Sequence, residues 1–440
     1  MDDWLNRTAA DLGRDIEKGA IDPKDLTEVF LSAIGAHRHR DRVYARLTED
    51  RARAEATAAS DRAKRGLRRS PLDGVPISWK DLYDSGGVAT ESGTALLAGR
   101  TPTKDATVLA NATEAGLVCL GKTHQTEFAF SGLGLNPVTA SPPCVNDEGA
   151  VSGGSSSGAG TSVAFGLAAV GIGSDTGGSV RIPSVWNDLV GLKTMHGRLP
   201  LTGVLPLCAK FDTVGPLCRT VEDAALTLAV LENGKPADLT GVSLSGMRFG
   251  LLKSQAFNGT EEKPLAAFEA AVVALEKAGA VVQPLEIDAV DAATRLGPIL
   301  FPAEAYAQWR DRIEADGDKM YPPVRTRFLQ GKTISAADYI AAWHQLDDLR
   351  LMYRDAVAGF DAVILPSCPI MPPQMDALLA DDAFFTERNL MALQNTRIGN
   401  ILGLAAITLP TVTPSCGLML QGESEERLLR IAAAMEHLIS

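Results

Sequence analysis

Residues 174–181 read Ser-Asp-Thr-Gly-Gly-Ser-Val-Arg, a stretch that has two glycines directly before a serine. Glycine allows a sharp backbone bend, so consecutive N–H groups can converge on one point beside the serine hydroxyl. Oxyanion holes are built in this way next to a nucleophile. The stretch therefore predicts a nucleophile at Ser179 and an oxyanion hole formed by the backbone of Thr176, Gly177 and Gly178.

Two upstream segments carry the chemistry that such a serine needs. Residues 153–158 read Gly-Gly-Ser-Ser-Ser-Gly, and residues 74–81 read Gly-Val-Pro-Ile-Ser-Trp-Lys-Asp. A serine hydroxyl is a weak nucleophile and requires a base. Lys80 is a candidate because it follows an apolar run, but burial must lower its pKa by about 3 units or more from about 10.4. A salt bridge to Asp81 is the alternative, and the local sequence leaves both open.

The three segments, taken in order, resemble the amidase signature family of Ser-Ser-Lys amide hydrolases. The resemblance implies that Lys80 is the base, Ser155 the bridging serine, preceded by a cis peptide bond, and Ser179 the nucleophile. The two serines are separated by 24 residues (179 − 155), which matches the spacing in the family. The implied reaction is hydrolysis of the C–N bond of a linear carboxylic amide through a serine acyl-enzyme, with release of ammonia or an amine. No cofactor and no metal are implied.

Helical and strand-like segments alternate along the chain, which predicts an α/β fold. The resemblance extends from about residue 74 to residue 231. It implies one large domain with a central mixed, mostly parallel sheet that is flanked by helices. Within this domain we expect residues 1–66 to form an N-terminal helical segment that packs on the core, and residues 67–440 to form the amidase domain.

The substrate is the least defined part of this prediction. Phe130 and Ser131 follow a segment that resembles the substrate-side loop of the family. The region from about residue 300 to residue 358 should also shape the pocket. Its large aromatic side chains are expected mainly to pack in the core. The chain departs from the family pattern at residues 151–152 and near Cys144, which leaves the shape of the neighbouring loop, and hence the substrate, open.

Three other interpretations compete with a hydrolase. Residues 116–123 match the phosphate-binding pattern Gly-x-x-x-x-Gly-Lys-Thr, but the apolar residues between the glycines resemble a strand, which cannot wrap phosphates. A glutaminase-type subunit of an amidotransferase complex, which liberates ammonia for a partner enzyme, would use the same catalytic residues. A binding module without activity would not need Lys80, Ser155 and Ser179 together. None of the six histidines lies in a context typical of a catalytic triad.

Composition excludes several classes of partner. The 440 residues carry a net charge of −12, which argues against nucleic acid as the main partner. The mean hydropathy of +0.04 and the absence of a long apolar run argue against a membrane protein. The six cysteines are scattered without a disulfide or metal pattern, so we expect a cytoplasmic protein that acts on a small-molecule amide. A homodimer remains an open alternative.

Overall fold

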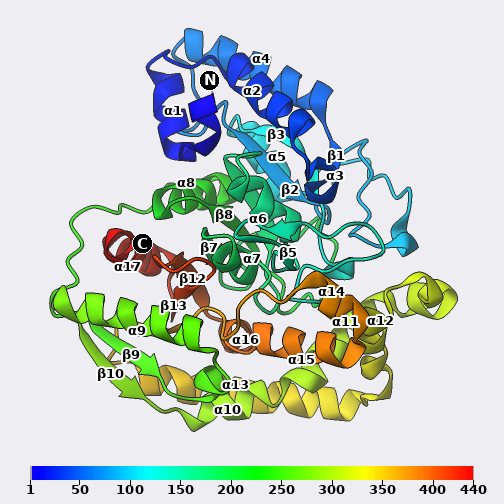
Figure 1. Ribbon diagram of the computed structural model, residues 1–440, viewed down its shortest axis with the longest axis vertical. Helices are drawn as coiled ribbons and strands as arrows, with labels where there is room; N and C mark the ends of the chain where they lie inside the picture. The colour runs from blue at the N-terminus through cyan, green and yellow to red at the C-terminus, as the bar shows by residue number, and fades with distance from the viewer. Residues whose placement is uncertain (1, 440) are drawn as a thin grey trace.

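A sheet of 11 strands runs through the molecule, and the computed structural model describes residues 2–439 (Figure 1). The strand order is β1-β3-β2-β6-β8-β7-β12-β13-β11-β9-β10. The strands are β1 (Tyr44–Leu47), β2 (Pro76–Lys80), β3 (Val118–Thr123), β6 (Val170–Ser174), β7 (Val190–Lys193), β8 (Val214–Cys218), β9 (Arg248–Leu252), β10 (Val281–Leu285), β11 (Ala362–Pro366), β12 (Ala405–Pro410) and β13 (Gly417–Gly422). A separate two-stranded sheet is formed by β4 (Pro143–Cys144) and β5 (Asp147–Val151).

The large sheet is mixed, as the sequence predicts. At one end β3, β2 and β6 are parallel neighbours, and at the other end β11, β9 and β10 are parallel neighbours. All the other neighbouring strands are antiparallel. Parallel pairing is therefore confined to two groups of three strands. Antiparallel strands form the centre that joins these two groups. The sheet therefore contains more antiparallel pairing than the mostly parallel sheet that was expected.

Helices flank the sheet (Figure 1). They are α1 (Ala9–Glu17), α2 (Pro23–Ala36), α3 (Arg40–Val43), α4 (Glu49–Lys64), α5 (Thr107–Glu114), α6 (Ser157–Ala164), α7 (Arg181–Trp186), α8 (Val221–Glu232), α9 (Glu262–Lys277), α10 (Asp288–Thr294), α11 (Gly297–Asp316), α12 (Pro322–Leu329), α13 (Ala336–Val357), α14 (Met375–Ala380), α15 (Asp382–Leu393), α16 (Thr396–Ile401) and α17 (Glu425–Ile439). The N-terminal helices lie at the end of the molecule that holds β1 and β3, and α9, α10 and α13 lie near the opposite end. Within residues 2–439, no helix is both long enough and apolar enough to cross a membrane.

Local signals determine where several helices begin. α2 begins at Pro23, and the Asp22 side chain accepts a hydrogen bond from the Lys24 N–H. α8 begins after Thr220, whose side chain accepts a hydrogen bond from the Asp223 N–H. Such caps satisfy backbone donors that have no acceptor inside the helix. Both helices therefore begin directly after a residue whose side chain caps the first turn.

One strand lies inside the segment that the sequence predicts as helical. β1 pairs antiparallel with β3, with Tyr44 opposite Thr123 and Leu47 opposite Gly121. Tyr44 is buried, and its hydroxyl donates a hydrogen bond to the Leu167 carbonyl. A strand of four residues is too short to show a clear alternation of polar and apolar side chains. Its conformation depends on pairing with β3, which the local sequence does not reveal.

The carboxyl ends of β2 and β6 bring the predicted motifs together. The two strands are parallel neighbours, with Trp79 opposite Ile172. β2 ends at Lys80, and the rest of the 174–181 segment follows β6. Neighbouring parallel strands have their carboxyl ends at the same edge of the sheet, where open α/β proteins bind ligands. The serine-rich segment reaches this edge directly before α6 begins at Ser157.

Candidate active site

A buried ion pair holds the segment that contains the predicted nucleophile. Asp175 accepts hydrogen bonds from the backbone N–H of Gly178 at 2.8 Å and of Val180 at 3.0 Å. The Arg181 guanidinium lies 2.9 Å from the same carboxylate, and both side chains are fully buried. Burial opposes ionisation of Asp175, but Arg181 and the other donors outweigh burial and hold the pKa of this carboxyl well below its ordinary value. Asp175 and Arg181 therefore brace the loop.

The bend before the predicted nucleophile requires glycine at position 178. Gly178 has a φ of +141°, and a Cβ atom there would lie 2.1 Å from Thr396 Oγ1. Its N–H donates to Asp175, whereas the N–H groups of Thr176 and Gly177 have no hydrogen-bond acceptor in the described part of the chain. Of the predicted oxyanion donors, Thr176 and Gly177 are therefore free, and Gly178 shapes the loop. The sequence did not separate these roles because they depend on where the Asp175 carboxylate points.

Lys80 is fully buried at the end of β2 and contacts two hydroxyl groups. Its Nζ donates to Ser155 Oγ at 2.7 Å and to Ser174 Oγ at 2.8 Å. Burial lowers the pKa of Lys80 to about 7, although the negative charges of Asp175 and Asp212 act in the opposite direction. A large fraction of the amine is therefore neutral at physiological pH.

The alternative salt bridge between Lys80 and Asp81 is wrong. The Asp81 carboxylate lies 2.8 Å from Arg46 and 3.2 Å from Lys122. Successive residues at a strand end point to opposite sides, so the neighbour of Lys80 in the sequence is not its neighbour in space.

Two other lysines are buried, and their contacts distinguish them from Lys80. Lys122 is paired with Asp81. Burial lowers the pKa of Lys193 to about 7 as well. However, Lys193 Nζ donates to two backbone carbonyl groups, one of them that of Leu404 at 2.7 Å. Among the three, Lys80 alone contacts serine hydroxyls, so geometry and not the lowered pKa singles it out.

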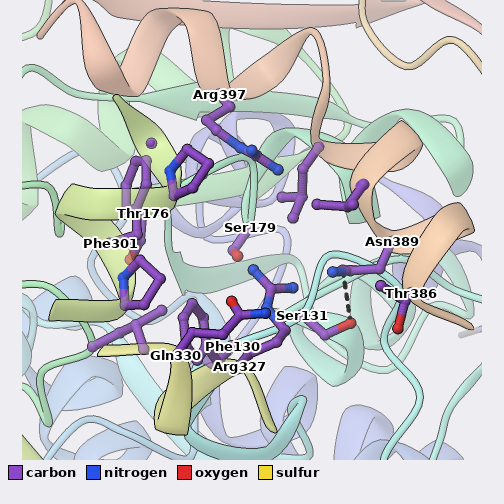
Figure 2. Close-up of a pocket in the computed structure, with 18 residues that line it drawn as sticks. Phe130, Ser131, Thr176, Ser179, Phe301, Arg327, Gln330, Thr386, Asn389 and Arg397 are labelled. Atoms are coloured by element: carbon purple, nitrogen blue, oxygen red, sulfur yellow. Dashed lines mark hydrogen bonds between the residues drawn. The ribbon is translucent and has the colours of Figure 1, made fainter. Parts of the chain in front are cut away.

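The two predicted catalytic serines lie on adjacent segments. The peptide bond between Gly154 and Ser155 is cis, as the resemblance implies. The Ser155 carbonyl accepts a hydrogen bond from the Thr126 N–H at 3.1 Å, and the Ser156 N–H donates to the Ser179 carbonyl at 3.2 Å. These contacts hold the serine-rich segment against the nucleophile segment. The Ser179 hydroxyl has no hydrogen-bond partner among the described residues and lies at the wall of a pocket (Figure 2).

This pocket has a volume of about 250 Å³, which suits a small molecule. Its walls come from the nucleophile segment, from residues 129–131 and from helices of the C-terminal half. It is lined by Ala129, Phe130, Ser131, Thr176, Gly177, Ser179, Leu207, Gly297, Pro298, Phe301, Pro302, Arg327, Gln330, Thr386, Asn389, Leu390, Leu393 and Arg397. Phe130 and Ser131, which the sequence associates with substrate, are thus part of the wall, and the Ser131 hydroxyl donates to Asn389 Oδ1 at 3.1 Å (Figure 2).

Several polar residues of the pocket were not identified from the sequence. Arg327 and Gln330 come from the region of residues 300–358, which the sequence analysis expected to shape the pocket. Asn389 and Arg397 come from α15 and α16, which it did not consider. No local pattern marks these side chains, because polar and charged residues on a helix usually cover a solvated face.

The large aromatic side chains of the same region pack as expected. Tyr321 is buried in the hydrophobic core, and Trp309, Tyr339 and Trp343 pack against it. None of them lines the pocket, and neither does Tyr306. No described histidine lines the pocket either. Across residues 2–439 there is no group of three or more His, Cys, Asp or Glu side chains that could hold a metal ion.

The nucleotide-binding alternative is wrong. Residues 116–123 do not form a loop, because β3 covers Val118–Thr123 and its backbone pairs with two neighbouring strands. Lys122 is buried, and its Nζ donates to the Tyr83 carbonyl at 2.6 Å and pairs with Asp81. A phosphate-binding loop needs backbone N–H groups and a lysine that face the ligand, and this segment provides neither.

Comparison with known proteins identifies the family of the chain. A family model described as Amidase matches residues 25–424. The chain is 33% identical to 2-amino-5-chloromuconic acid deaminase from Comamonas testosteroni over 94% of both chains. It is 32% identical to a component of the glutamyl-tRNA(Gln) amidotransferase from Anaeromyxobacter dehalogenans, over 96% of this chain and 94% of that component. A crystal structure of amidase superposes with a TM-score of 0.89 at 28% identity, over 99% of this chain and 100% of the other.

The α/β fold and these comparisons define an enzyme that hydrolyses amides. The chain belongs to the amidase signature family, since the family model spans nearly its whole length.

Proposed function

We propose that the enzyme hydrolyses a carboxylic amide through an acyl-enzyme on Ser179, with Ser155 and Lys80 as a proton relay. The contact that carries this proposal is the hydrogen bond of 2.7 Å between buried Lys80 Nζ and Ser155 Oγ. The lowered pKa of Lys80, about 7, supports it because an amine accepts a proton only in its neutral form. The position of Ser179 in the wall of the pocket supports its role as the nucleophile.

We infer a reaction in which these groups act in the following order. Ser179 Oγ attacks the amide carbonyl and passes its proton to Ser155, while the Ser155 proton passes to neutral Lys80. The carbonyl oxygen becomes negatively charged, and the free N–H groups of Thr176 and Gly177 stabilise it. The C–N bond then breaks, and the relay returns a proton to the leaving amine. Water attacks the resulting ester by the same route and releases the carboxylic acid and free Ser179.

A role within an amidotransferase complex is a second candidate, because a relative with 32% identity bears that name. The same residues would then release ammonia from glutamine for a partner enzyme. The purified chain distinguishes the two functions. Turnover of amides by the chain alone supports a hydrolase, whereas ammonia release from glutamine that requires a partner supports the amidotransferase. Size-exclusion chromatography of the same sample tests the homodimer.

The proposal extends to the organisation and location of the chain. We assign residues 1–66 to a segment that packs on the core and residues 67–440 to the amidase domain. A hydrogen bond of 2.8 Å from the Ala10 N–H to the Asp223 carboxylate supports this packing. The six cysteines are buried and free of disulfides, which supports a cytoplasmic location.

The proposed nucleophile is tested by covalent labelling. An alkyl fluorophosphonate should form an adduct with the wild-type protein, and peptide mapping should find it on Ser179. Ser179→Ala should remain unlabelled. Ser156→Ala is a matched control, because its hydroxyl donates to the Ser174 carbonyl and does not line the pocket. An adduct on Ser155, or full turnover of amides by Ser179→Ala, would refute the assignment.

A further inference from the structure

Two arginines in the pocket have no acidic partner. Arg327 lies on α12 and Arg397 on α16, and both line the pocket that contains Ser179 (Figure 2). Neither side chain forms a hydrogen bond or an ion pair with a described residue, and Arg327 Nη1 is buried without any partner. Arg181, by contrast, is fully buried but is paired with Asp175 at 2.9 Å. Arg327 and Arg397 thus differ from Arg181 in that no carboxylate accompanies their charge.

Both guanidinium groups are cationic at neutral pH. Burial, together with repulsion from Arg397, lowers the pKa of Arg327 to about 9. Burial lowers the pKa of Arg397 to about 10. A cation that is removed from water without a partner raises the free energy of the folded state. Buried charges in proteins are accordingly paired, or they bind a ligand of opposite charge.

The rest of the pocket offers nothing that could neutralise these cations. No Asp or Glu among the described residues lines it, and much of its wall is apolar, including Leu207, Phe301 and Leu393. The Arg327 guanidinium lies over the ring of Phe130, 4.4 Å from its centroid. This contact restrains the guanidinium, and the unused N–H donors of a guanidinium match the geometry of a carboxylate.

We propose that the substrate is a small amide that also carries a carboxylate group, and that Arg327 and Arg397 bind this carboxylate while the amide carbonyl lies at Ser179. The inference rests on the proposed function of Ser179 and names the substrate class of that site. Apolar side chains along the wall fit a short hydrocarbon chain between the two groups. Monoamides of linear dicarboxylic acids combine all three features.

The test compares amides of matched chain length that differ in charge. Ammonia release gives kcat/KM for succinamate and glutaramate, with butanamide and pentanamide as their neutral counterparts. We expect kcat/KM to be about 10- to 100-fold higher for the carboxylate-bearing amides, as for hydrogen bonds to charged groups. Equal kcat/KM for the charged and neutral amides of the wild-type enzyme would overturn the proposal.

Variants assign this preference to the two arginines. Arg327→Gln and Arg397→Gln should each lose about 10-fold or more in kcat/KM for glutaramate, while kcat/KM for pentanamide changes by no more than about 2- to 3-fold. Arg325→Gln is the matched control, because it lies on α12 outside the lining of the pocket and should keep the full preference. If both pocket variants keep the preference of the wild type, the assignment is wrong.

A binding measurement separates this inference from the proposed catalysis. Isothermal titration of glutaramate into Ser179→Ala measures binding without turnover. In the double variant that also carries Arg397→Gln, the Kd should be about 10-fold higher or more. If no amide is hydrolysed but Ser179→Ala binds glutaramate through Arg397, the recognition of a carboxylate stands and the catalytic role of Ser179 fails. If neutral amides are hydrolysed at Ser179 and glutaramate does not bind, the proposed function stands and the carboxylate site is wrong.

Discussion

Lys80 Nζ donates a hydrogen bond of 2.7 Å to Ser155 Oγ, and no carboxylate lies within ion-pair distance of this lysine among the described residues. The adjacent Asp81 is paired with Arg46 and Lys122 instead. Lys80 is therefore buried with hydroxyl partners, which do not stabilise the ammonium form as a carboxylate would. This relationship makes its protonation state the variable that should control activity.

Activity should rise with pH through about 7. Burial lowers the pKa of Lys80 from 10.5 to about 7, and only the neutral amine can act as a base. We expect kcat/KM, measured between about pH 5 and about pH 9, to follow a single ionisation and then level off. Lys80→Met should lower kcat by about 10²- to 10⁴-fold. Its stability should be at least that of the wild type below pH 7, because the charged amine destabilises the folded state there, and this effect shrinks as pH rises toward 10.5.

Lys193 provides the control for this pH profile. Burial lowers its pKa to about 7 too, but its Nζ donates to the carbonyls of Thr194 and Leu404. Lys193→Met should leave the midpoint of the profile in place, although the unpaired carbonyls should lower the free energy of unfolding by about 1–3 kcal/mol.

Substantial activity in Lys80→Arg, which cannot deprotonate, would show that position 80 needs only a fixed cation.

Gly178→Ala should distort the loop that carries the oxyanion N–H donors, without adding or removing a charge. The added Cβ would lie 2.1 Å from Thr396 Oγ1, at a φ of +141° that an L-residue rarely adopts. The resulting shift of the free N–H donors should lower kcat by about 10²- to 10³-fold, as for the loss of one oxyanion donor. Gly99→Ala is the control, because its φ is also positive, at +77°, but its Cβ would meet nothing within 4 Å. Near-normal kcat in folded Gly178→Ala would contradict the role given to this loop.

The catalytic segments could be identified from the sequence because their signals are local. Lys80, Ser155 and Ser179 each lie in a short motif whose glycines and spacing are visible without knowledge of the fold. Arg327 and Arg397 carry no such signal. Their place in the pocket depends on how α12 and α16 pack around the nucleophile segment. The antiparallel centre of the sheet escaped prediction for the same reason, because strand order is a property of long-range pairing.

Arg181→Met should destabilise the protein by about 3–5 kcal/mol, the usual consequence of removing one partner from a buried ion pair. The change leaves the Asp175 carboxylate buried without its cation. Urea unfolding measures the effect. Arg14→Met is a matched surface control: its pairs with Asp11 and Glu222 are exposed, so it should change the free energy of unfolding by no more than about 1 kcal/mol. A similarly small change in the free energy of unfolding for Arg181→Met would show that the buried Asp175 carboxylate does not need Arg181 as its partner.

Arg327→Gln should stabilise the free enzyme while it impairs recognition of the substrate. Since burial lowers the pKa of Arg327 to about 9, from 12.5, the charged side chain destabilises the folded state at neutral pH, and this effect declines only as pH rises above about 9. Because the residue is partly exposed to the pocket, we expect a gain on the order of 1 kcal/mol in the free energy of unfolding. Glutarate should raise the Tm of the wild type and of Arg325→Gln, but not that of Arg327→Gln, because an anion that binds only the folded state stabilises it. If Arg327→Gln has a lower Tm than the wild type and gains as much from glutarate, Arg327 serves the packing of α12 against Phe130 and not the binding of an anion.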